Sequence, residues 1–108
     1  MKNNQININN NYQFNQFQNS LNLIVIDRRN FDKEMIDYGA IIINEAYNLM
    51  NDGMDRAKYI SDSFNLKYPL IGKNWSCFIL PLSIFGNYYY SSYSIIYRTE
   101  NQKLLIFA

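Results

Sequence analysis

The feature that most constrains this chain is a regular spacing of apolar side chains between residues 36 and 50. The intervals are 4, 3, 4 and 3 residues, which places the side chains on one face of an α-helix. Asp32 can cap the first turn, where Glu34 also suits the helix dipole. The sequence therefore predicts a helix from about residue 32 to residue 50 that turns these side chains to the core: Ile36, Ala40, Ile43, Tyr47 and Met50.

A second helix is predicted directly after the first. Asn51 or Asp52 can cap its start, and Ala57, Ile60 and Phe64 are spaced to face inward. The pattern should end near residue 68, because the proline at position 69 disfavours helical backbone in the residue before it. The two helices are therefore adjacent in sequence, with only a short break between them.

Branched and aromatic residues in the remaining segments are typical of strands. The predicted strands cover residues 21–27, 74–80, 85–91, 93–99 and 103–108. The order along the chain is strand, two helices and four strands, which indicates an α+β domain. We expect two helices packed on a mainly antiparallel sheet of about five strands.

The first 22 residues have a different composition. They contain nine asparagines, and Lys2 is their only charged residue. A tract of this kind has few apolar side chains with which to form a core. We expect a disordered Asn-rich tail over residues 1–22 and one folded domain over residues 23–108. A self-associating Asn-rich segment is the less favoured alternative.

The composition argues against several classes of function. Ten Lys and Arg residues nearly balance nine Asp and Glu residues, so the basic patch of a nucleic-acid-binding protein is not indicated. The chain has no histidine and one cysteine, Cys77, and its four glycines do not have the spacing of a phosphate loop. We expect a cytosolic protein without enzymatic activity, cofactor, metal, nucleic acid or membrane. A hydrolase that uses paired carboxylates is a remote alternative.

The stretch FGNYYYSSY, residues 85–93, predicts a strand with aromatic rings on both faces. Successive side chains of a strand alternate, so Tyr88 and Tyr90 share one face and Tyr89 lies on the other. Three such rings would expose about as much surface as the largest apolar patch of a typical monomer, roughly 300 to 600 Å². We therefore expect a partner to cover them, and a domain this small gains stability from a second subunit.

Several stretches together resemble one family: VIDRRNFDKEM, YISDSFNLKY, NWSCFI, FGNYYYSS and LLIF. The chain from Leu23 to Ala108 is similar to the small, homodimeric hub-type dynein light chains. The resemblance implies a non-catalytic protein in which the strand at residues 85–91 crosses to the sheet of a second subunit. It also implies that a linear segment of the dynein intermediate chain, or of another partner, adds to this strand by β-augmentation. The setting it implies is the cytoplasm and the microtubule cytoskeleton, where the motor is cytoplasmic or axonemal.

The resemblance assigns roles to individual positions. The peptide-binding residues that it implies are Gly86, Asn87, Tyr88, Tyr90, Tyr97 and Met54. The dimer-interface residues that it implies are Trp75, Ser76, Phe85 and Tyr88.

The start of the second helix departs from the family pattern. Gly53 and Met54 stand where the family has an acidic residue and a lysine that contact peptide. Methionine offers a flexible apolar surface in place of a charged donor, so the peptide contact should become apolar. The alternative that the sequence leaves open is a dynein-independent dimerisation hub of the same fold.

Overall fold

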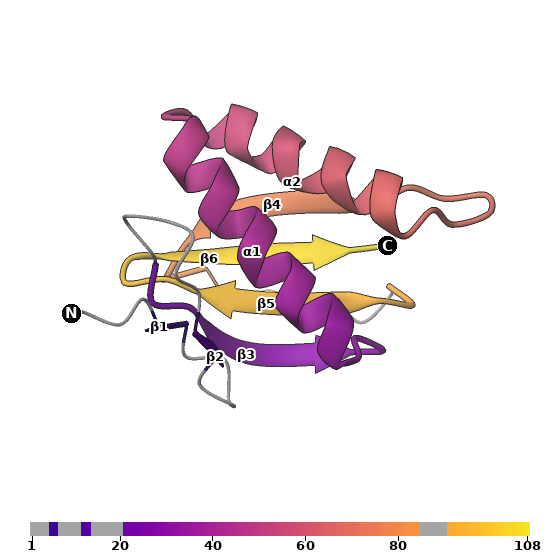
Figure 1. Cartoon of the computed structure of the whole chain (residues 1–108), viewed down its shortest axis with the longest axis horizontal. Coiled ribbons are helices and arrows are strands. Elements are labelled where there is room, and N and C mark those ends of the chain that lie inside the picture. The colour runs from indigo at the N-terminus through magenta and orange to yellow at the C-terminus, as the bar shows by residue number, and fades with distance from the viewer. Residues whose placement is uncertain (1–4, 7–11, 14–20, 85–90) are drawn as a thin grey trace.

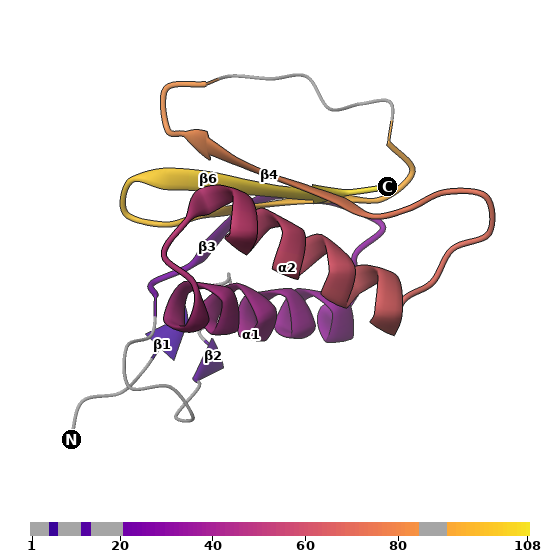
Figure 2. The same cartoon turned by 90° about the horizontal axis from the view of Figure 1, so that it is seen from above.

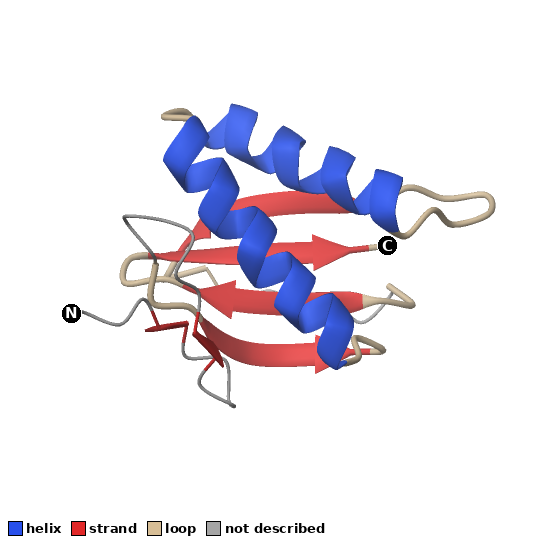
Figure 3. Cartoon of the chain, viewed as in Figure 1, coloured by secondary structure: helices blue, strands red, loops and turns tan. Residues whose placement is uncertain are grey.

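The computed structural model describes residues 5–6, 12–13, 21–84 and 91–108. These residues form an α+β structure in which two helices pack on one antiparallel sheet (Figure 1; Figure 3). Figure 2 shows that both helices lie on the same side of that sheet. The main elements are β3 (Ile24–Arg29), α1 (Lys33–Leu49), α2 (Gly53–Lys67), β4 (Ser76–Pro81), β5 (Ser94–Arg98) and β6 (Gln102–Phe107).

The four strands of the sheet lie in the order β3-β5-β6-β4, and every neighbouring pair is antiparallel. β3 and β4 are therefore the two edges of the described sheet. β3 carries a bulge between Val25 and Asp27, which interrupts its pairing with β5. β4 pairs with β6 without a break and ends at Pro81, a residue that sheets tolerate at an edge.

Alternation along the strands separates an inner face, which the helices cover, from an outer face. Ile95, Ile106 and Cys77 are opposite one another on β5, β6 and β4, and all three are buried on the inner face. One residue further along, Ile96, Leu105 and Phe78 are opposite one another on the outer face. The core therefore forms between the inner face and the two helices.

Both helices begin where the sequence predicts. The Asp32 carboxylate accepts a hydrogen bond from the Met35 backbone N–H at 2.9 Å, and Asp52 caps α2 in the same way. Ile36, Ala40 and Ile43 are buried on α1, as their spacing predicts. The two predicted helices are confirmed.

A buried asparagine, which the sequence patterns do not predict, links α1 to the chain before β3. Asn44 is fully buried, and its Oδ1 accepts a hydrogen bond from the Leu21 backbone N–H at 2.7 Å. Its Nδ2 donates to the Ala40 carbonyl oxygen at 2.9 Å, so the amide is used at both ends. This link fixes Leu21 against the helix, although residues 1–22 were predicted to form a tail.

The described part of the sheet has four strands, whereas about five were predicted. The predicted strand at 85–91 falls almost wholly on residues 85–90, which lie outside the described residues. A two-residue pair, β1 (Gln5–Ile6) with β2 (Tyr12–Gln13), was not predicted. Of the helices that the structure describes, neither has the length and apolar composition needed to cross a bilayer.

A close approach between α1 and β5 yields a test of this packing. A methyl group at Gly39 would overlap the Tyr97 Oη. We expect Gly39→Ala to lower the free energy of unfolding by about 2 kcal/mol in urea titrations. The cost should be smaller in a Tyr97→Phe background, because that substitution removes the nearest atom.

Gly53→Ala is the matched control, since nothing lies within 4 Å of a methyl group at that position. It should change stability by less than about 0.5 kcal/mol. An equal cost of Gly39→Ala in both backgrounds would contradict the proposed contact.

Candidate functional site

A groove of about 600 Å³ lies between the start of α2 and the edge strand β4. Met54 and Ala57 line it from α2, and Phe78, Ile79 and Leu80 line it from β4. Met54 is 82% exposed, so its side chain is accessible to a ligand in the groove. The groove therefore combines apolar side chains with an edge strand of the described sheet.

The polar side chains beside this groove are already engaged. The Asp52 carboxylate accepts hydrogen bonds from the Met54 and Asp55 N–H groups at 3.1 and 3.2 Å. Gln102 Oε1 accepts from the Tyr47 hydroxyl at 2.5 Å. Burial raises the pKa of Tyr47, which keeps that hydroxyl protonated as the donor. What the groove offers a ligand is therefore apolar contact and backbone hydrogen bonding.

The outer face of the sheet next to the groove is also apolar. Phe78 is 50% exposed, and its ring lies 5.3 Å from that of Phe107. Leu105 lies between Phe78 and Ile96 in the register and is almost fully buried. Ile24, on the edge strand β3, is partly exposed. Apolar side chains thus occupy outer-face positions on all four strands, with Leu105 buried among them and Asp27 as the β3 residue opposite Ile96.

The structure does not place Tyr97 in the groove. Its side chain is on the inner face, fully buried, and its hydroxyl donates to the Ile36 carbonyl oxygen at 2.6 Å. The β5 side chain on the outer face is its neighbour Ile96. Two consecutive apolar residues precede Tyr97, so alternation in the sequence alone did not determine which face it takes.

Trp75 likewise lies inside the subunit. Its ring is 5.7 Å from Phe31 and 5.2 Å from Phe64, and its Nε1 donates to the Tyr68 carbonyl oxygen at 2.7 Å. Ser76, the next residue, is half-buried on the outer face opposite Phe107. The other predicted site residues, Phe85, Gly86, Asn87, Tyr88 and Tyr90, lie outside the described residues.

The structure therefore brings Met54 together with residues 78–80 of β4, whereas the side chains of Trp75 and Tyr97 do not line the groove. Sequence analysis did not assign a role to Phe78, Ile96 or Phe107. The available signal was the apolar character of both faces of the segment 74–80, since a strand covered on one side needs only one apolar face.

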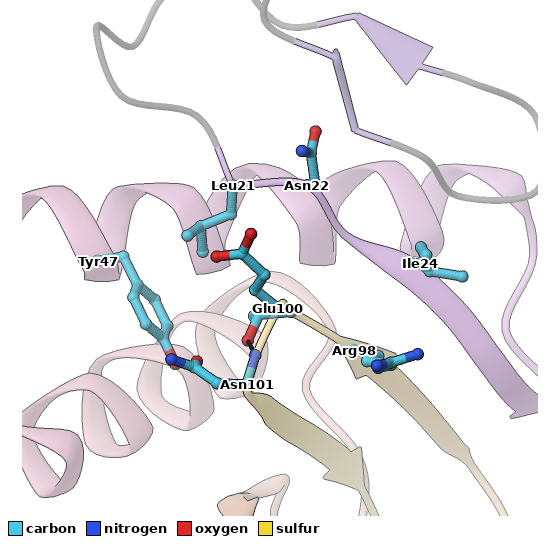
Figure 4. Close-up of a pocket in the computed structure, with 8 residues that line it drawn as sticks. Leu21, Asn22, Ile24, Tyr47, Arg98, Glu100 and Asn101 are labelled. Carbon is cyan, nitrogen blue, oxygen red and sulfur yellow. Dashed lines mark hydrogen bonds between the residues drawn. The ribbon is translucent and has the colours of Figure 1, made fainter. Parts of the chain in front are cut away.

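A second cavity, of about 520 Å³, lies at the start of β3 (Figure 4). It is lined by Leu21, Tyr47 and the turn between β5 and β6. In Figure 4 the Glu100 carboxylate points toward Leu21, and the Arg98 guanidinium points away from that carboxylate. Within residues 21–84 and 91–108, no group of three or more Cys, Asp or Glu side chains is placed to hold a metal ion.

The chain was also compared with known proteins. Neither the family models nor the curated proteins gave a match to its sequence.

Cys77 is among the residues that line the groove, and the reactivity of its thiol tests how deeply the thiol is buried. Burial raises the pKa of the Cys77 thiol to about 12, so the unreactive protonated form predominates at neutral pH. At pH 8 we expect iodoacetamide to label the native chain about a thousandfold more slowly than the urea-unfolded chain. The rates can be followed by mass spectrometry. Similar rates in both states would show that the thiol is open to solvent.

Proposed function

We propose that this chain is a non-catalytic, homodimeric hub of the dynein light chain type that binds linear segments of partner proteins by β-augmentation. The observation that carries the proposal is the edge strand β4, which lies beside an apolar groove and continues into an apolar outer face. An unpaired edge presents a row of N–H and C=O groups to which another strand can add.

A second copy of the chain is the proposed cover for the outer face. Half-exposed aromatic and branched side chains there favour association, because burying them removes apolar surface from water. A symmetric pair buries the same surface on both subunits. In the proposed dimer the segment 85–91 of each chain adds to β4 of the other, with Phe85, Tyr88 and Ser76 at the contact.

The proposed peptide then adds to the free side of the crossing strand. Gly86, Asn87, Tyr88 and Tyr90 would supply that strand, and Met54 would contact the peptide from the start of α2. Two such grooves per dimer hold two partner segments in parallel, so avidity raises the strength of binding without catalysis.

The proposed partner is the dynein intermediate chain, which makes the protein an accessory of a microtubule motor in the cytoplasm or axoneme. The apolar groove at Met54 favours a second candidate, a dynein-independent hub of the same fold. Capture on the purified chain from native cells, with blotting for dynein intermediate and heavy chains, distinguishes the two.

The proposed dimer predicts a difference between two surface substitutions. Phe78→Glu places a charge on the outer face beside the edge, and we expect it to raise the dimer dissociation constant at least tenfold, about 1.4 kcal/mol. Ile71→Glu is the control, because Ile71 is fully exposed in the loop between α2 and β4 that extends from one end of the molecule (Figure 1; Figure 2).

Sedimentation velocity over a concentration series measures both variants. Far-UV circular dichroism of each variant verifies that the helices are retained. A wild-type chain that remains monomeric, or a Phe78→Glu chain that dimerises like the wild type, would refute the proposed dimer.

The proposed groove predicts weak binding of the glutamine-containing motif typical of the family. Met54→Lys supplies a charged donor at the groove, and we expect it to tighten binding of such a peptide roughly tenfold in calorimetric titrations. Leu66→Lys adds the same charge at an exposed position of α2 outside the groove and should leave affinity unchanged. Tight binding by the unmodified chain would contradict the role given to Met54.

A further inference from the structure

Three side chains from two separate parts of the chain form hydrogen bonds with Ser91 and Ser92, two of them to the backbone. Asn30 Nδ2 donates to the Ser92 carbonyl oxygen at 2.6 Å, and Arg29 Nη1 donates to that of Ser91 at 3.4 Å. Lys73 Nζ donates to Ser92 Oγ at 3.1 Å from the loop before β4. We call Arg29, Asn30 and Lys73 the serine clamp.

Asn30 has the backbone conformation that makes it the informative member. Its φ is 58°, in the left-handed region, and it is the single described non-glycine residue with a positive φ. Glycine adopts this conformation with less strain than any L residue, although asparagine tolerates it. A requirement for the turn alone would therefore be met at least as well by glycine. The side-chain bond to Ser92 is what asparagine adds.

Aromatic contacts hold both ends of this hydrogen bond. Phe31 follows Asn30, and its ring lies 5.7 Å from Trp75. Tyr93 follows Ser92, and its ring lies 5.5 Å from the ring of Trp75. Because both neighbours pack on one buried indole, Asn30 and Ser92 are pre-positioned and little entropy is lost when they bond.

Ser91 and Ser92 are the residues through which the chain passes into Tyr93 and β5. Ser91 is the last residue of the segment that, in the proposed dimer, pairs with the other subunit, and Ser92 directly follows that segment. A strand whose end is fixed loses less conformational entropy on pairing than one whose end is free. The serine clamp therefore acts on the proposed interface through the backbone, without contact to the partner.

We propose that Asn30 is a positioning residue for dimerisation and peptide binding: its amide fixes the backbone of Ser92 and thereby the end of the strand that crosses to the second subunit. This inference rests on the proposed function. It goes beyond that proposal because the residues that position the end of the crossing strand lie outside both the groove and the interface.

Two substitutions separate the side-chain bond from the backbone conformation. Asn30→Gly allows the left-handed backbone and removes the donor. Asn30→Asp keeps the size and shape of the side chain but faces the Ser92 carbonyl oxygen with a second acceptor. We expect Asn30→Gly to raise the dimer dissociation constant about fivefold, as for loss of one hydrogen bond, and Asn30→Asp to raise it by about tenfold or more.

Sedimentation velocity over a concentration series gives the dissociation constants, with Ile71→Glu as the surface control. Fluorescence of Trp75, the one tryptophan of the chain, shows whether the aromatic core is intact in each variant. Weakened dimers with unchanged Trp75 emission are the expected result for both substitutions, together with a parallel loss of peptide affinity.

The possible outcomes distinguish this inference from the proposed function. If the wild-type chain dimerises and Asn30→Gly dimerises equally well, Asn30 serves only the turn and the inference is overturned while the dimer stands. If only Asn30→Asp weakens the dimer, the inference is also overturned, since that weakening would reflect repulsion by the new carboxylate. A wild-type chain that stays monomeric overturns both.

Discussion

The packing of Trp75 is the interaction on which the other features depend. Its ring contacts Phe31 at the end of β3, Phe64 on α2 and Tyr93 before β5. Its backbone N–H donates to Asn65 Oδ1 at 2.7 Å, and Asn65 belongs to α2. Trp75 thus ties the helical layer to both halves of the sheet.

This packing fixes the direction of every side chain on β4. Because β4 begins one residue after Trp75, Cys77 must turn inward and Phe78 outward. A shift of one residue would exchange the two faces and would expose the core. The same constraint that buries Cys77 therefore places Phe78 on the outer face of β4, an edge strand of the described sheet.

Long periodic patterns and local caps were enough to predict the helices, since each depends on residues close in sequence. The capping carboxylates of Asp32 and Asp52 are examples. The strands of the described sheet were also predicted, with bounds that differ by one to three residues. The number of strands was not settled, because residues 85–90 are outside the described part.

The site was less predictable because it depends on contacts between distant residues. In the sequence, Asn44 is a polar interruption of an apolar helix, and its burial is explained by its hydrogen bonds with Leu21 and Ala40. Tyr97 follows two isoleucines, so its direction is fixed by the pairing of β5 with β6 and not by local alternation. The positive φ of Asn30 likewise could not be interpreted from the sequence, because the hydrogen bond from its side chain goes to Ser92, 62 residues further along the chain.

The polar side chains beside the proposed groove form hydrogen bonds within the chain, and this limits how the groove discriminates between partners. Asp52 and Gln102 bond within the chain, so selectivity must come from backbone pairing and from the shape of apolar side chains. Backbone pairing accepts almost any extended segment, and a flexible methionine adapts to many side chains. A groove of this kind favours a broad range of partners. In the proposed dimer, the strength of binding must then come from the geometry of the two subunits, so we expect the residues that fix the end of the crossing strand to matter more than further contacts in the groove.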